Sequence, residues 1–158
     1  MSGGIGALPD SSLIAIPLGA TRRVLCASPA YLGARGTPRT PEDLTGHDCI
    51  SYPGFASPEA WTFVENKTNV AVPVHTRLVV GSAEAAFAAA RAGIGITIAF
   101  AYQLQAGPES GALTTVLDDF QPAPQPVNLV YASNRFLPIK VRAFLDFAAP
   151  RLKQAFAQ

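Results

Sequence analysis

The chain alternates between short apolar runs and polar turns, and this pattern predicts an α/β fold. Short runs of β-branched and apolar residues bounded by turn residues are typical of strands. They occur at 24–27, 49–52, 60–65, 70–80, 94–99, 112–117 and 127–133. Two segments, one after Ser82 and one from about Ile139, instead repeat apolar residues at helical spacing. Strands that alternate with helices in this way indicate an α/β domain.

Serine residues mark the expected helix starts. Ser28 precedes a proline and predicts the cap of a short helix over 29–34. Ser82 predicts a second cap, and Gly93 ends the helix that follows it. The sequence GIG at 93–95 therefore lies after a helix and before a strand, the reverse of the order in a dinucleotide-binding motif. We expect no nucleotide site there.

Prolines set further limits on these elements. Pro73 lies within the run 70–80, which predicts a strand at a sheet edge or one with a bulge. Three prolines in 118–126 are expected to exclude regular structure from that segment. Pro150 is expected to kink the last helix or to end it early.

The residues that carry catalytic chemistry elsewhere are isolated in this sequence. Cys26 and Ser28 are candidate nucleophiles, but a strand cysteine followed by a helix cap explains both without chemistry. His47 and His75 have no second histidine or carboxylate at metal-ligand spacing, so no metal site is expected. No serine lies in a GxSxG motif. We expect neither enzyme activity nor a cofactor.

Composition excludes several classes of partner. Charged residues make up only 15% of the 158 residues against 49% hydrophobic ones, which favours a surface partly covered by a partner. The net charge is +1 and the basic residues form no cluster, so direct DNA binding by this chain is not expected. The first ten residues lack the charged and apolar regions of a signal peptide, and no apolar run reaches membrane-spanning length, so neither export nor membrane insertion is expected. A reduced, cytoplasmic protein is the simplest interpretation.

Four motifs together resemble a known family. They are SPAYL after a strand, TPEDL before a His-Asp-Cys turn, AGIGI after an alanine-rich helix, and LPIKVRAFLDF near the end. In this order they resemble the C-terminal, effector-binding (substrate-binding) domain of a LysR-type transcriptional regulator. The similarity runs from about Gly6 to Phe147.

The resemblance implies a periplasmic-binding-protein-like (type 2) lobe, a mixed sheet flanked by helices, with the second lobe largely missing. It implies three segments: 1–21 as a remnant of the first lobe and crossover, 22–133 as the second regulatory lobe, and 134–158 as the C-terminal helix of the first lobe. The family carries a winged helix-turn-helix that this sequence lacks, so we expect an N-terminally truncated sensor fragment.

The resemblance also implies ligand-binding positions. In similar proteins the loop after the strand at 49–52 faces the effector, and the GIG turn lies nearby. The implied ligand-binding residues are Ser51, Tyr52, Pro53, Gly54, Phe55 and Gly95. Ser51 or Tyr52 would donate to a carboxylate and Phe55 would flank an aromatic ring. A solvent-exposed loop that closes a sheet is the alternative interpretation of these residues.

The expected partner is therefore a small-molecule effector, a small organic acid, and the expected assembly is a homodimer. Two alternatives remain: a stand-alone ligand-binding or dimerisation module, and an enzyme built on the same fold. An enzyme would need polar residues that converge in a pocket, and the sequence offers only scattered ones.

Overall fold

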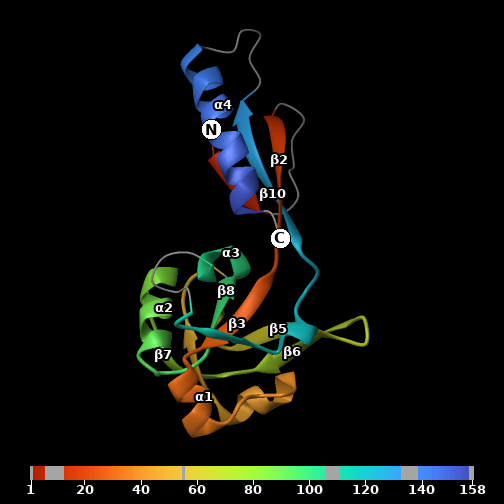
Figure 1. The fold of residues 1–158 in the computed structure, drawn as a ribbon. Coiled ribbons are helices and arrows are strands. Elements are labelled where there is room, and N and C mark those ends of the chain that lie inside the picture. Colours follow the sequence, from red (N-terminus) through yellow and green to blue (C-terminus); the bar gives the residue numbers. More distant parts are fainter. Residues whose placement is uncertain (1, 6–12, 55, 106–110, 133–138, 157–158) are drawn as a thin grey trace. The chain divides into compact units, whose positions relative to one another are not determined.

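The chain forms two compact units in the computed structural model, which describes residues 2–5, 13–54, 56–105, 111–132 and 139–156. The smaller unit consists of Met1–Thr21 and Ala123–Gln158, and the larger consists of Arg22–Pro122 (Figure 1). The larger unit thus ends before residue 123, whereas the expected second lobe extended to 133. The reason is that strand β10 (Gln125–Ala132) pairs with strands of the smaller unit.

The smaller unit is an antiparallel sheet covered by one helix. The strand order is β1 (Ser2–Ile5), β10, β2 (Leu13–Thr21). Helix α4 (Ile139–Ala155) packs on this sheet (Figure 1), where Leu145, Leu152 and Phe156 contact Leu18 and neighbouring strand residues. Pro150 was expected to kink α4 or to end it early, and the second of these alternatives is wrong, because the helix continues past Pro150 to Ala155. Apolar contacts on both sides of Pro150 hold the helix against the sheet.

The larger unit contains three small sheets that share one core. An antiparallel sheet has the order β8 (Thr97–Phe100), β3 (Arg23–Ala27), β9 (Thr114–Val116). Strand β4 (Asp48–Ser51) pairs in parallel with β7 (His75–Val79), and β5 (Ala60–Glu65) forms an antiparallel hairpin with β6 (Thr68–Pro73). The backbone of Ile50 bonds to that of Ile96 at 2.8 Å, which joins β4 to the segment before β8.

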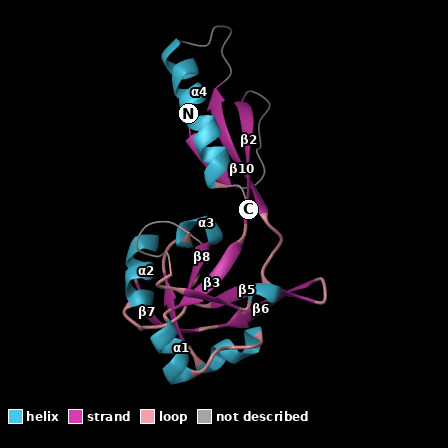
Figure 2. Ribbon diagram, viewed as in Figure 1, coloured by secondary structure: helices cyan, strands magenta, loops and turns pink. Residues whose placement is uncertain are grey.

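Helices lie on the outside of these sheets (Figure 2). Among the residues that the structure describes, they are α1 (Pro29–Arg35), α2 (Ala83–Arg91), α3 (Ala101–Leu104) and two 3-10 turns, Pro41–Gly46 and Asp118–Phe120. The two serine caps are confirmed. Ser28 Oγ accepts from the Tyr31 amide at 3.1 Å, and Ser82 Oγ accepts from the Ala85 amide at 3.2 Å.

Three expected elements differ from the structure. The run 70–80 is two strands in different sheets, because the chain leaves the β5–β6 hairpin after Pro73 and enters the β4–β7 sheet at His75. Strand β8 begins at Thr97 rather than Ile94. The segment 118–126 is not wholly irregular, since a 3-10 turn opens it and β10 already includes Pro126.

Candidate functional site

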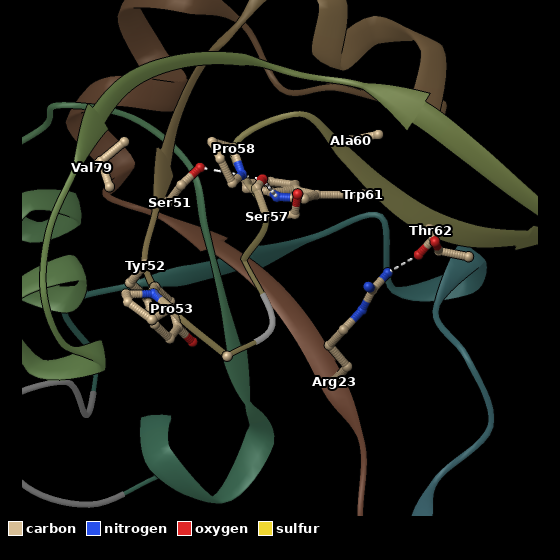
Figure 3. A pocket seen from close by; sticks show the side chains of 11 residues that line it. Arg23, Ser51, Tyr52, Pro53, Ser57, Pro58, Ala60, Trp61, Thr62 and Val79 are labelled. Atoms are coloured by element: carbon tan, nitrogen blue, oxygen red, sulfur yellow. Dashed lines mark hydrogen bonds between the residues drawn. The ribbon is translucent and has the colours of Figure 1, made fainter.

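The larger unit has a cavity of about 500 Å³, partly open to solvent, beside the end of β4. Its walls come from β3, β4, β5, β7 and the turns after β4 (Figure 3). The lining residues are Arg23, Ser51, Tyr52, Pro53, Gly54, Ser57, Pro58, Ala60, Trp61, Thr62 and Val79. Four of the six residues expected to bind ligand, Ser51 to Gly54, are therefore brought together at one cavity. Phe55 lies outside the described residues.

Ser51 takes part in a chain of hydrogen bonds that holds one wall of the cavity. The Thr76 hydroxyl donates to the Pro58 carbonyl at 2.7 Å, so its oxygen accepts from the Ser51 hydroxyl at 3.0 Å. The Ser51 hydroxyl also lies 3.3 Å from the Ser57 carbonyl. Because a serine has a single hydroxyl proton, Ser51 has none left for a ligand. The expected donation from Ser51 to a carboxylate is not available in this arrangement.

Tyr52 is likewise committed to the protein. Its hydroxyl donates to the Ile98 carbonyl at 2.8 Å, and its side chain is buried. Burial raises the pKa of the Tyr52 hydroxyl well above its ordinary value, so the group stays neutral. The Tyr52 amide bonds to the Ala56 carbonyl at 3.2 Å and closes a turn. Gly54 has a φ of +116° in this turn, a conformation that favours glycine.

Trp61 holds the same wall from strand β5. Its indole Nε1 donates to the Ser57 carbonyl at 2.9 Å, and only 2% of the residue is exposed. The Ser57 and Pro58 carbonyls are thus held by side chains from β4, β5 and β7. The cavity has a wall that is fixed before any ligand arrives, which lowers the entropy cost of binding.

Arg23 is the one permanently charged residue among the described residues that line the cavity, and the sequence did not single it out. Its Nε donates to Gln121 Oε1 at 2.8 Å and its Nη2 donates to the Thr62 carbonyl. Its Cζ lies 5.2 Å from the centre of the Phe63 ring. Burial lowers the pKa of Arg23 to about 10, so it remains protonated at neutral pH. An arginine at the first position of a buried strand was the signal available in the sequence.

Gly95 does not line the cavity. It packs against β4, where a Cβ atom would lie 2.4 Å from the Asp48 carbonyl oxygen. Such a separation is far inside van der Waals contact, so this position needs glycine for packing. The structure gives Gly95 a role in close backbone approach and does not bring it to the other expected ligand residues.

The remaining candidates for chemistry have structural roles in the larger unit. Cys26 and Cys49 are fully buried, and burial raises the pKa of each thiol to about 12, which leaves them unreactive at neutral pH. Ser28 caps α1. His47 Nδ1 lies 2.9 Å from the buried Tyr31 hydroxyl. No group of His, Cys, Asp and Glu side chains within the described part of the chain has the geometry of a metal site.

Comparison with known proteins identifies the family. A model of the LysR substrate binding domain matches residues 3–153. The chain belongs to this family. An uncharacterized HTH-type transcriptional regulator, YhjC of Escherichia coli, is 32% identical over 151 residues, which cover 94% of this chain and 50% of that protein. A similar regulator of Haemophilus influenzae is 31% identical over 137 residues, or 87% and 48%.

Solved structures agree with this assignment. The regulatory domain of AphB from Vibrio vulnificus has a TM-score of 0.76 and 28% identity, covering 94% of this chain and 73% of that one. The regulatory domain of CrgA from Neisseria meningitidis, a LysR-type transcriptional regulator, has a TM-score of 0.77 and 29% identity, covering 93% and 72%. These matches confirm the resemblance drawn from the motifs and the periplasmic-binding-protein-like α/β fold.

The chain is therefore an effector-binding domain of the LysR family, and the relatives it matches are transcriptional regulators rather than enzymes. It spans about half the length of the curated relatives it matches. Within the described residues, no helix is both long and apolar enough to cross a lipid bilayer.

Proposed function

We propose that this chain is the sensing part of a cytoplasmic transcriptional regulator and that it binds a small organic acid in the cavity at the end of β4. The observation that carries the proposal is the cavity itself: Ser51, Tyr52, Pro53 and Gly54 all line it, and these residues come from the loop expected to face an effector. Its volume falls within the range of ordinary small-molecule sites.

The relatives support the regulatory role. They carry the description HTH-type transcriptional regulator, and the solved structures similar to this chain are named as regulatory domains. The net charge of this chain is +1, without a basic cluster in its sequence. DNA contact is therefore assigned to other parts of such a regulator and not to this chain. No catalytic role is proposed, because the buried cysteines and capping serine already have structural roles.

A melting-temperature panel tests the proposal. The purified chain is heated with aromatic acids, aliphatic acids, amino acids, sulfate and phosphate. A ligand at 100 times its dissociation constant stabilises the folded protein by about 2.7 kcal/mol, which gives a clear shift. A selective shift with one class of organic acid supports the proposal, and a panel without any shift contradicts it.

A variant at Val79 tests whether the ligand binds in this cavity. It lines the cavity and is 62% exposed, so Val79→Glu adds a negative charge at the rim with little loss of packing. We expect this variant to lose the shift given by an acid. Ala34→Glu adds the same charge on the exposed face of α1, away from the cavity lining, and is the matched control. Equal shifts in both variants would exclude this cavity as the binding site.

Self-association is a second candidate function, favoured by apolar exposure on α4. Phe144 is 47% exposed and Phe147 is 60% exposed on this helix. Such residues often mark a protein interface. We propose a homodimer that uses this surface. Sedimentation should show a dimer for the chain and a monomer for the Phe144→Ser, Phe147→Ser double variant, whereas a monomer in both would contradict it.

A further inference from the structure

Arg23 carries a charge that its surroundings do not neutralise. Its two hydrogen-bond partners are the Gln121 side chain and the Thr62 carbonyl, and both are neutral. It forms no ion pair with any residue that the structure describes. The Phe63 ring, which is fully buried, covers one side of the guanidinium at 5.2 Å. A half-buried cation held only by neutral groups is a site that gains from an added anion.

No neighbouring group that lines the described part of the cavity competes with Arg23 as the charged donor to an anion. None of the described residues lining the cavity is acidic, so nothing there competes for the guanidinium. The hydroxyl protons of Ser51 and Tyr52 are already bonded to Thr76 and to the Ile98 carbonyl. A carboxylate in the cavity would therefore find its charged donor in Arg23.

The guanidinium is also held in a fixed position. Its Nε and Nη2 are bonded to the protein, while Nη1 makes no hydrogen bond to any described residue. Arg23 is drawn on one side of the lining residues in Figure 3, with Val79 on the other side. A donor that is already oriented loses little side-chain entropy when it binds a ligand.

We propose that Arg23 recognises the single negative charge of the effector and makes the cavity selective for monocarboxylates over neutral analogues and over dicarboxylates. Selection against a second carboxylate follows because Arg23 is the one cation among the described residues of the lining, so a second carboxylate would lose part of its hydration in the cavity without gaining a charged partner. This inference rests on the proposed function, since it assigns the group that reads the ligand in the same cavity.

Pairs of ligands that differ only in charge test the inference on the unaltered chain. The pairs are benzoate with benzamide, indole-3-acetate with indole-3-acetamide, and hexanoate with hexanamide, and phthalate adds a second carboxylate to benzoate. A charge-assisted hydrogen bond predicts that the acid of a responding pair binds about tenfold or more tightly than its amide. We expect phthalate to bind more weakly than benzoate.

Two neighbouring arginines provide the variant and its control. Arg23→Gln removes the charge in the cavity, and we expect it to bind acid and amide equally. Arg22→Gln removes the same charge one position earlier, where the side chain is exposed and does not line the cavity, and should keep the preference for the acid. Arg23→Lys keeps the charge and should keep part of the preference, which separates a lost charge from a disturbed fold.

The outcomes separate the two proposals. If acid and amide bind equally to the unaltered chain, the role of Arg23 is overturned while small-molecule binding stands, and the Val79→Glu variant still tests whether that binding is in the cavity. If Arg23→Gln retains the preference for the acid, another group reads the charge and the inference is again wrong. If no member of any pair binds, both the proposed function and the inference are overturned. If Arg23→Gln does not fold, Arg23→Lys takes its place, and an undiminished preference for the acid and an unchanged ratio of benzoate to phthalate binding in that variant would overturn the role of Arg23.

Discussion

The two units differ in how completely they bury their apolar side chains. In the larger unit Leu25, Trp61 and Phe63 are each no more than 2% exposed and belong to one continuous core. In the smaller unit, the buried apolar side chains that the structure describes all remain 5–9% exposed, and Phe147 is 60% exposed. Local stability follows buried apolar surface, so the smaller unit should open at a lower free energy than the larger one.

The difference also separates scaffold from site. The cavity lies wholly within the larger unit, and its walls are held by buried side chains such as Trp61. A binding site on a rigid scaffold keeps its geometry when other parts of the chain open. We therefore expect ligand binding to depend on the core of the larger unit and to tolerate loosening of the smaller one.

Truncating one core residue in each unit gives the largest expected effect. Phe63→Ala should destabilise the larger unit by about 3–5 kcal/mol, because it leaves a cavity in a fully buried position. Leu145→Ala in α4, which is 6% exposed, should destabilise the smaller unit by about 2 kcal/mol, at the low end for such changes. Hydrogen exchange resolved by segment measures each unit separately. Equal losses of stability in the two units would contradict the predicted difference in how well they bury their apolar side chains.

A substitution in α4 should strengthen the weaker unit. Pro150 lies inside the helix with an exposed ring and cannot donate the backbone hydrogen bond to the Asp146 carbonyl. Pro150→Ala restores that donor and should slow exchange of the α4 amides, with a gain of up to about 3 kcal/mol. Lys153→Ala, at an exposed position in the same helix, is the control and should change stability by less than about 0.5 kcal/mol. Unchanged hydrogen exchange of the α4 amides in Pro150→Ala would mean that the missing hydrogen bond at Pro150 does not limit the stability of the smaller unit.

Close backbone packing offers a third comparison. Gly95→Ala should destabilise the larger unit by about 1–3 kcal/mol, because its Cβ would meet the Asp48 carbonyl of β4 at 2.4 Å. Gly19 in the smaller unit has a φ of +139°, and a Cβ atom there would lie 3.0 Å from the Phe156 carbonyl oxygen, so Gly19→Ala should affect only that unit. Gly33→Ala, with nothing within 4 Å in α1, is the control and should stabilise slightly. Denaturant unfolding that shows no loss in Gly95→Ala would contradict the packing role.

Local signals in the sequence predicted where helices and strands occur better than they predicted which strands pair and which elements pack together. The caps at Ser28 and Ser82 were predictable because a cap depends on a few adjacent residues. The split of the run 70–80 was not, because β6 pairs with its neighbour β5 in a hairpin, whereas β7 pairs with β4, a strand that precedes this hairpin in the sequence. The persistence of α4 through Pro150 has the same cause, since packing on the sheet overrides a local preference.

The same distinction applies to the candidate site, whose ligand-binding role stays a prediction. The loop at 51–54 follows a strand, and the structure places it at the cavity. The commitment of the Ser51 and Tyr52 hydroxyls was not predictable, because their partners Thr76 and Ile98 are distant in sequence. Arg23 was missed because its neighbours Gln121 and Thr62, which hold it at the cavity, come from two other regions of the chain.

The buried residue His47 gives the smallest of the expected effects. It tests the larger unit at the hydrogen bonds between His47, Tyr31 and Asp48. The Tyr31 hydroxyl accepts from the Asp48 amide at 3.0 Å, and its single proton is then available for His47 Nδ1 at 2.9 Å. This assignment makes His47 a neutral acceptor. Burial, and next the positive charge of Arg35, hold the pKa of His47 below its ordinary value, against the opposing effect of Asp43 and Asp48.

The sign of the pH effect follows from that lowered pKa. Above the unfolded-state pKa of about 6.5, His47 is neutral in both the folded and the unfolded chain. Folding then does not have to remove a proton from its imidazole ring, so its burial does not lower the stability in this way. As the pH falls below 6.5 the unfolded chain takes up the proton first, so stability is lost until the lower folded-state pKa is passed. His47→Gln removes this contribution, and urea unfolding at pH 7.5 and pH 5 should show a smaller drop than in the unaltered chain. The same drop in both proteins would mean that the pKa of His47 is not lowered in the folded state. The packing of His47 against Tyr31 of α1 would then not exclude water as its burial indicates.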